Sequence, residues 1–229
     1  MRRLLLFLLL CLLVFPVSAQ RRWDRPRWTP VQSVTEGFFL EGNLNGTSIS
    51  FDDDEDQGES ESGGGLGLRL GYGFNRMIAL YAGLNGAAIE PEEDSFEAIT
   101  GEETFGVGTL DLGLQLSFGS ARRALIPYLN IALSGATATF EIDNDAADGD
   151  LTLSGGALTL GGGLRYHFSP GLAVNVGLEG YGGEFTEAEF DGEVFGGNAD
   201  FEDDIEDTEF SGSRLRIGLT WFPGAGRRR

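Results

Sequence analysis

Hydrophobic residues alternate with polar residues or glycine along eight stretches of this chain. In the clearest stretch, Leu66–Phe74, every even-numbered position is Leu, Tyr or Phe and every odd-numbered position is Gly or Arg. A period of two predicts a β-strand with one apolar face. The other seven stretches contain Leu40, Leu80, Leu112, Ile131, Leu160, Val174 and Ile217. The sequence therefore predicts an all-β protein with eight strands.

The connections between these stretches alternate between short and long. Three are short: Asn75–Met77, Gly119–Ala124 and Ser169–Gly171. The four long ones contain 31 of the 36 acidic residues and no Lys, Arg or His; they are Asp52–Ser62, Glu90–Glu103, Glu141–Asp150 and Glu184–Glu209. Barrels that span a membrane keep one set of turns short and let the other set grow. We predict an eight-stranded antiparallel up-and-down transmembrane β-barrel.

Aromatic residues gather where the strands meet the short connections. Such a girdle is typical of the interface between the apolar layer of a membrane and water. We call this set the aromatic girdle: Phe38, Tyr72, Phe74, Phe118, Tyr166, Phe168, Trp221 and Phe222. A soluble lipocalin-like barrel is the alternative, because alternation alone does not say which face points inward. The girdle and the many glycines on the polar face favour the membrane barrel.

The amino terminus has the pattern of a secretory signal peptide. Arg2 and Arg3 precede an apolar run that ends in small residues at Ala19, and the run is shorter than the ~20 residues of a membrane-spanning helix. We predict a signal peptide over 1–19, a periplasmic arm over 20–36, the barrel over 37–222 and a basic tail over 223–229. The only cysteine, Cys11, lies in the signal peptide, so the mature chain is expected to have no disulfide.

Two segments, Gly65–Tyr72 and Leu215–Phe222, resemble strands of the small eight-stranded outer-membrane barrels, the group of opacity-type adhesins and OmpA-like proteins. The resemblance implies the outer membrane of a Gram-negative-type bacterium, with both termini in the periplasm. It also implies that outer-membrane lipid, lipopolysaccharide and the barrel assembly machinery are partners. The family usually ends on the aromatic residue, whereas here Pro223–Arg229 follow. We expect a monomer that does not bind nucleic acid, since the formal net charge is -20.

Charged residues on the polar face lie at similar distances from the short connections. We call them the charged layer: Glu41, Arg69, Asp111, Arg165, Glu179, Arg214 and Arg216. A barrel of eight strands has little room beyond its own side chains. We interpret the layer as ion pairs that close the lumen, with Glu41 between Arg69 and Arg216. The alternative is a narrow ion-conducting channel.

A lipid-modifying enzyme is a third possibility. Its base would be His167, the only histidine, which lies beside the short connection with Ser169. That end is far from the outer leaflet, so we predict no catalytic residues. The expected role is structural or concerns the cell surface: envelope integrity, adhesion or cation binding.

The acidic segments contain candidate ligands for calcium or magnesium, and we predict no other cofactor. Asp143–Asp150 resembles a calcium loop but lacks the ligand spacing of an EF-hand. The alternative is a solvated acidic surface, which a saline habitat would also favour. The candidate ligands are Asp52, Asp53, Asp54, Asp143, Asp145, Asp148, Asp203 and Asp204.

Overall fold

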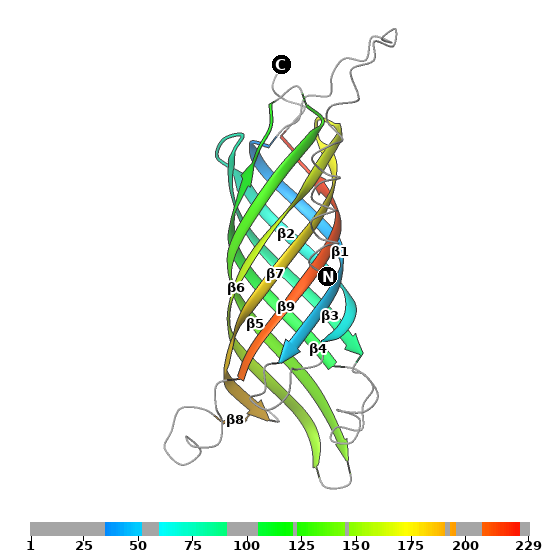
Figure 1. Cartoon of the computed structure of the whole chain (residues 1–229), viewed down its shortest axis with the longest axis vertical. Helices are drawn as coiled ribbons and strands as arrows, with labels where there is room; N and C mark the ends of the chain where they lie inside the picture. The colour runs from blue at the N-terminus through cyan, green and yellow to red at the C-terminus, as the bar shows by residue number, and fades with distance from the viewer. Residues whose placement is uncertain are drawn as a thin grey trace, which may run out of the picture. The chain divides into compact units, whose positions relative to one another are not determined.

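The computed structural model describes residues 35–51, 60–90, 105–120, 123–144, 147–190, 193–195 and 208–224. Within these residues, eight long strands form one closed sheet and a ninth, short strand extends it (Figure 1). The strands are β1 (Gly37–Phe51), β2 (Glu61–Gly73), β3 (Ile78–Glu90), β4 (Phe105–Ser117), β5 (Leu125–Asn144), β6 (Ala147–Ser169), β7 (Leu172–Phe190), β8 (Glu193–Phe195) and β9 (Thr208–Trp221).

Each long strand pairs antiparallel with the strand before and after it. One further pairing, of the first strand β1 with the last strand β9, closes the barrel and leaves no open edge among the eight long strands. β8 pairs only with the end of β7. The predicted eight-stranded up-and-down barrel is confirmed. In the part of the chain that the structure describes, no helix is long and apolar enough to cross a membrane.

The outer face of the barrel is apolar and the inner face is polar around the middle of the strands. Leu66 is 67% exposed, whereas Arg69 on the same strand is 2% exposed. A soluble lipocalin-like barrel would need the reverse arrangement, so the structure excludes that alternative. We call the outward side chains between the girdle and the long connections the leucine belt, whose last members toward the long connections are Leu44, Leu66, Leu84, Leu110, Leu133, Leu158, Leu178 and Leu215.

The end of the barrel with the short connections, hereafter the turn end, carries the aromatic girdle. Seven of its eight predicted members are exposed on the outer wall. Phe222 is the exception, and its assignment to the girdle was wrong. It follows the end of β9, its N–H donates to the Gly171 carbonyl, and its side chain is 2% exposed inside the barrel.

Glycines on the inner face leave space for the large side chains of the lumen. A Cβ atom on Gly113 would lie 2.6 Å from the ring of Tyr81. Cβ atoms on Gly163 and Gly177 would lie 2.6 and 2.5 Å from the hydroxyl of Tyr128. The two tyrosines therefore depend on glycines of neighbouring strands, as expected for a narrow, filled lumen.

Beyond the leucine belt, toward the long connections, the outer face of the barrel becomes polar and the inner face becomes apolar. Here, at the loop end, the outward positions are small or polar, such as Gly46, Ser48 and Ser213. The inward positions become apolar and form what we call the loop-end cluster: Ile49, Ile89, Phe105, Val107, Ala136, Ala138, Phe140, Tyr181, Phe185 and Phe210. Two ring pairs stack within it, Phe185 on Phe210 at 4.3 Å and Phe105 on Phe140 at 4.9 Å between centroids. This part of the barrel is built like a soluble protein.

Part of the acidic sequence that we predicted to lie in long connections is strand. Glu141–Asn144 continues β5 and Ala147–Asp150 continues β6, so the third connection is a long hairpin beyond the other strands (Figure 1). In the fourth connection, β7 runs on to Phe190. Backbone pairing continues there because β5, β6 and β7 are adjacent and each new residue completes a ladder of hydrogen bonds.

The last residues of the predicted arm contact the turn end. The Thr35 hydroxyl donates to the carbonyl of Arg76 at 3.1 Å, and the Glu36 carboxylate lies 3.6 Å from the Arg76 guanidinium. The predicted signal peptide, the arm up to residue 34 and the tail from residue 225 lie outside the described residues.

Candidate functional site

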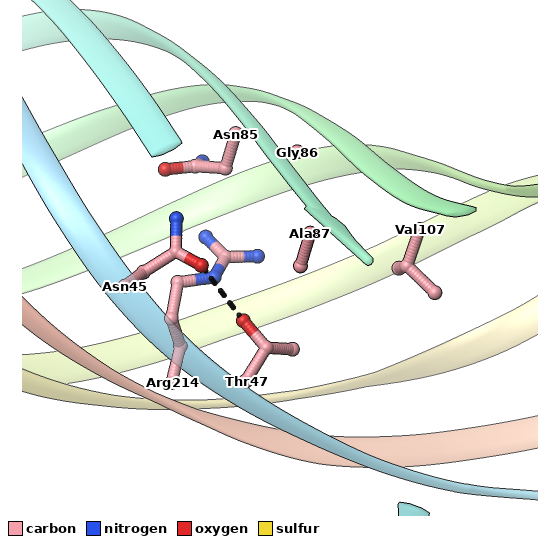
Figure 2. A pocket seen from close by; sticks show the side chains of 7 residues that line it. All are labelled: Asn45, Thr47, Asn85, Gly86, Ala87, Val107 and Arg214. Carbon is pink, nitrogen blue, oxygen red and sulfur yellow. Dashed lines mark hydrogen bonds between the residues drawn. The ribbon is translucent and has the colours of Figure 1, made fainter. Parts of the chain in front are cut away.

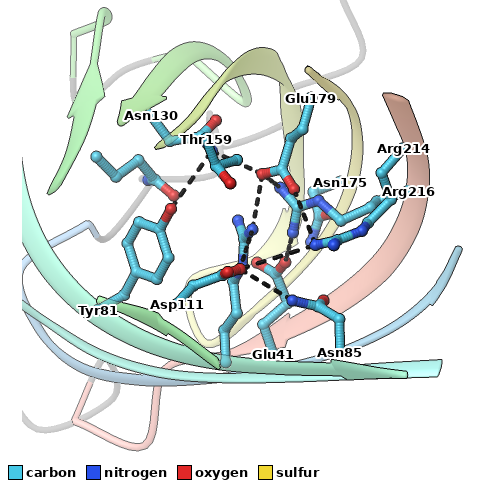
Figure 3. Close-up of polar contacts among 12 residues, drawn as sticks. Glu41, Tyr81, Asn85, Asp111, Asn130, Thr159, Asn175, Glu179, Arg214 and Arg216 are labelled. Carbon is cyan, nitrogen blue, oxygen red and sulfur yellow. Dashed lines mark hydrogen bonds and ion pairs between the residues drawn. The ribbon is translucent and has the colours of Figure 1, made fainter. Parts of the chain in front are cut away.

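The seven side chains of the charged layer all lie inside the barrel, and each is at most 3% exposed. They come from β1, β2, β4, β6, β7 and β9, so they converge from nearly the whole circumference. Figure 3 shows Glu41, Asp111, Glu179, Arg214 and Arg216 pointing toward one another inside the barrel. On each strand they occupy positions whose side chains point inward. The tilt of the strands brings them to the same height inside the barrel. Three carboxylates and four guanidinium groups meet there.

Glu179 on β7 is the centre of this layer. Its Oε1 atom lies 2.7 Å from Nη2 of Arg69 and 2.8 Å from Nη2 of Arg216, and its Oε2 atom lies 3.6 Å from Nη1 of Arg214. The side-chain amide of Asn130 also donates to Oε1, at 2.6 Å. One carboxylate therefore serves three guanidinium groups from two strands, β2 and β9.

Asp111 on β4 extends the layer toward the loop end. Its Oδ2 atom accepts a hydrogen bond from the Asn85 amide at 2.9 Å and lies 3.8 Å from guanidinium nitrogens of both Arg69 and Arg214. Arg214 also donates to the hydroxyl of Thr109 at 3.1 Å. The Asn85 amide and the Thr109 hydroxyl thus add hydrogen bonds from neutral groups to the contacts between carboxylates and guanidinium groups.

Glu41 on β1 pairs with one of its two predicted partners, Arg216, and not with the other, Arg69. Its Oε1 atom lies 3.1 Å from Nη1 of Arg216, and its Oε2 atom lies 3.5 Å from Nη2 of Arg165 and accepts from the Thr220 hydroxyl at 3.0 Å. Arg69 is its cross-strand neighbour on β2. No ion pair joins Glu41 and Arg69 among the described residues, because Arg69 reaches across the lumen to Glu179. The prediction of that pair was wrong.

The layer has one more guanidinium group than carboxylates, and aromatic rings lie against three of the cations. Arg165 is within 5.7 Å of the ring centroids of Phe39, Tyr128 and Phe222. Arg69 lies 4.6 Å from the Tyr81 centroid and Arg214 lies 5.3 Å from that of Tyr181. The negative face of an aromatic ring attracts a cation within about 6 Å. These contacts offset part of the excess positive charge.

Apolar side chains lie on both sides of the charged layer. On the turn side, six residues form what we call the turn-end cluster: Phe39, Ala79, Tyr81, Ala132, Ala173 and Phe222. On the other side is the loop-end cluster. Where that cluster meets the charged layer, Asn45, Thr47 and Asn85 lie beside Arg214 of the layer, and the Thr47 hydroxyl donates to Asn45 (Figure 2). The space that they line has no room for a water molecule.

His167, the candidate base, is fully buried at the turn end. Its ring lies 5.5 Å from that of Phe222, centroid to centroid, and neither ring nitrogen has a hydrogen-bond partner among the described residues. Its side chain makes no hydrogen bond to Ser169 there. A general base must reach the proton that it removes, and this imidazole is enclosed by the turn-end cluster.

The predicted metal ligands contribute no described cluster. Asp52, Asp53, Asp54, Asp145, Asp203 and Asp204 lie outside the described residues, and for Asp143 and Asp148 only the backbone is described. Among the side chains that the structure does describe, no three His, Cys, Asp or Glu residues form a metal-binding group.

Sequence reasoning missed the loop-end cluster, although the sequence contains a signal for it. Along β1 the apolar positions change phase: Leu40 and Leu44 are even-numbered, whereas Ile49 and Phe51 are odd-numbered like Glu41. A change of phase within one strand indicates that the apolar face moves from the outside of the barrel to the inside.

The comparison with known proteins agrees with this architecture. The sequence matches the outer membrane protein beta-barrel domain over residues 7–213. Neisserial surface protein A has a similar structure, with a TM-score of 0.56, 13% identity, and coverage of 81% of this chain and 97% of that chain. At this identity the likeness shows the fold alone.

Two other solved structures have lower TM-scores. OprG of Pseudomonas aeruginosa gives 0.48 at 16% identity, with coverage of 83% and 98% of the two chains. Ail, the attachment invasion locus protein of Yersinia pestis, gives 0.46 at 13% identity, with coverage of 81% and 99%. No curated protein sequence matches this chain.

Proposed function

The chain belongs to the family of the outer membrane protein beta-barrel domain, and from this premise we propose that it is a monomeric barrel of a Gram-negative outer membrane, with a sealed lumen and with its acidic segments at the cell surface. Its role is then structural or one of surface interaction. The observation that carries the proposal is the sequence of layers in the lumen: buried ion pairs with an apolar cluster on either side.

A sealed lumen follows from the physical character of these layers. An ion that entered would have to shed its water to pass the loop-end cluster, where ten buried residues, five of them aromatic, offer it no compensating charge. Beyond it, the guanidinium groups are already paired with carboxylates. A conducting path would require both layers to rearrange, which favours the closed barrel over the narrow channel.

The purified barrel is expected to give no steady conductance of porin size in planar lipid bilayers. The reason is that neither the loop-end cluster nor the charged layer leaves a continuous aqueous path. Single-channel recording at high salt tests this, with a known porin inserted under the same conditions as the positive control. Long-lived openings that scale with the amount of folded barrel would contradict the sealed lumen.

We place the loop end outside the cell and both termini in the periplasm. The support is the asymmetry of the connections, since family barrels have long extracellular loops and short periplasmic turns. The composition of the two ends provides a direct test. The four acidic segments contain no Lys or Arg, whereas the short connections contain Arg76, Arg122 and Arg123.

Treating intact cells with a glutamate-specific protease is expected to cleave the barrel within the acidic segments, and trypsin is expected to leave it whole. After the outer membrane is opened, trypsin gains access to the arginines of the turn end. Mass spectrometry of the released peptides reads out both cases. Trypsin cleavage at the turn-end arginines of intact cells would show the opposite orientation.

We also propose that the acidic loops bind calcium or magnesium and through it the phosphates of lipopolysaccharide. The support is the charge density of the loops, which hold most of the acidic residues and no cation. Millimolar calcium is then expected to slow the cleavage by the glutamate-specific protease relative to EDTA. Cleavage of the denatured chain in the same two buffers is the control, and equal rates on the folded barrel would remove the proposal.

A further inference from the structure

A groove of about 500 Å³ lies on the outer wall of the barrel across β5, β6 and β7. It is located where the leucine belt ends. Leu133 and Leu158 form its lower rim and are 71% and 46% exposed, while Gly156 and Gly182 form its floor. Its volume falls in the range of about 300–1,000 Å³ that is typical of small-molecule sites.

Backbone pairing explains why a groove exists here. Leu133, Leu158 and Gly182 are successive cross-strand neighbours, so the third position of this row has no side chain. In the next row toward the loop end, Gly156 stands beside Glu184. Leucine side chains therefore border the groove on one side, and only backbone atoms form its floor at Gly156 and Gly182.

A β-bulge builds the upper rim of the groove. The register between β6 and β7 shifts between Ser154 and Gly155, so that Ser154 pairs with Glu187 and Gly155 with Phe185. Thr186 is the extra residue, and it is exposed at the edge of the groove. Bulges often redirect side chains in this way.

Acidic side chains lie beside the groove and favour a cationic ligand. Glu184 at the rim lies directly opposite Glu209 on β9, and both side chains are exposed. Like charges in directly opposed positions of an antiparallel pair destabilise the sheet. A positively charged group above the groove would remove this repulsion.

We propose that the groove binds a lipid of the surrounding membrane that has an ammonium headgroup: one acyl chain lies over Gly156 and Gly182, and the ammonium group lies between Glu184 and Glu209. The acyl chain is favoured because the groove opens from the leucine belt, the surface that lipid already covers. A second copy of the chain fits less well, since a two-fold contact places the same patch on both partners. Two concave grooves would then face each other with their glutamates in opposition.

This inference deepens the proposed function, because it names the lipid that the barrel selects, and it rests on the embedding of the leucine belt in a membrane. The lipid-binding experiment uses the purified barrel with added lipids, so its result does not depend on which end faces the cell exterior. The protease experiment and the lipid-binding experiment can therefore fail independently of each other.

Native mass spectrometry of the folded barrel tests the proposal. The protein is released from neutral detergent after incubation with equal amounts of phosphatidylethanolamine and phosphatidylglycerol, in EDTA so that no metal bridges a phosphate to the glutamates. The wild-type barrel is expected to retain one phosphatidylethanolamine. Equal retention of the two lipids would overturn the headgroup assignment, and a dimer that retains no lipid would show that a second copy occupies the groove.

Two variants separate the groove from the rest of the lipid-facing surface. Gly156→Leu is expected to abolish retention, because a Cβ at this position meets nothing within 4 Å and the side chain fills the groove without moving the wall. Gly86→Leu on β3 is the matched control, since Gly86 is also exposed with open space around its Cβ position but lies outside the groove. Equal retention by these two variants would overturn the proposal.

The headgroup contact has its own variant. Glu184→Gln is expected to reduce the preference for phosphatidylethanolamine over phosphatidylglycerol several-fold while leaving binding of the acyl chain in place. An unchanged preference would overturn the role of the carboxylate. The folded state of each variant is checked by its shift in gel mobility on heating, so that loss of lipid is not confused with loss of the barrel.

Discussion

Replacing Glu179 with glutamine is expected to lower the free energy of unfolding of the barrel by about 3–5 kcal/mol, the usual effect of removing one partner from a buried ion pair. This carboxylate is 1% exposed and is within ion-pair distance of Arg69, Arg214 and Arg216. Without it, four guanidinium groups of the charged layer face only Glu41 and Asp111. The destabilisation comes from cations that remain buried without a counter-charge, since the amide preserves the shape of the side chain.

Urea unfolding of the barrel in detergent micelles measures this change, with tryptophan fluorescence as the signal. Glu189→Gln is the matched control, because Glu189 lies on the same strand but is exposed and faces the neutral Thr152 on β6, and surface changes are usually within about 0.5 kcal/mol. The double variant Glu179→Gln with Arg214→Gln is expected to recover part of the loss, because it removes one of the unpaired cations. Equal stability of the Glu179→Gln variant and the wild type would show that the charged layer does not hold the lumen together.

The sequence predicted the barrel and the inward direction of the charged residues, because both depend on a period of two that is visible within each strand. Leu66, Leu68 and Leu70 face outward and Arg69 faces inward, as the alternation requires. The approximate level of the charges was also predictable, since distance from a short turn can be counted along one strand. These features need no knowledge of how neighbouring strands are tilted.

Only some partners within the charged layer were predictable in the same way: Glu41 pairs with Arg216 on the adjacent strand as expected, but its predicted pair with Arg69 is not formed. Strand tilt carries a side chain toward residues several strands away, so cross-strand neighbours are not always ion pairs. Glu41 and Arg69 are neighbours in the β1–β2 register, yet Glu41 pairs with Arg165 on β6 and Arg69 with Glu179 on β7. Long arginine side chains span the lumen, and their final partners depend on the closed barrel as a whole.

The loop-end cluster shows that the apolar residues of a single strand can face lipid along one part of the strand and the barrel interior along another. Up to the end of the leucine belt the apolar residues face lipid, and beyond it they face the interior, where they pack against one another. On β9, for example, Leu215 is exposed and Phe210 is buried. Water must therefore surround the outer wall at the loop end, because small and polar residues replace leucine there. We infer that the barrel projects from the membrane at this end with an apolar core of its own.

The end of the leucine belt accordingly predicts where the membrane ends, and arginine substitutions on the outer wall test it. Leu114→Arg, in the middle of the belt on β4, is expected to cost about 2–4 kcal/mol of unfolding free energy in a lipid bilayer, whereas the same residue near the interface costs about 0–1 kcal/mol. Thr137→Arg on β5 belongs to the second class, because Thr137 is exposed beyond Leu133, the last belt residue of its strand.

Unfolding by guanidinium chloride in large unilamellar vesicles measures both variants against the wild type. A large loss for Leu114→Arg with little change for Thr137→Arg places the apolar layer between the aromatic girdle and the end of the belt. Similar losses at both positions would extend the membrane over the loop end, and the loop-end cluster would then lie at membrane depth. Near-zero losses at both positions would mean that water wets the leucine belt, which an outer wall of this composition could not tolerate without aggregation.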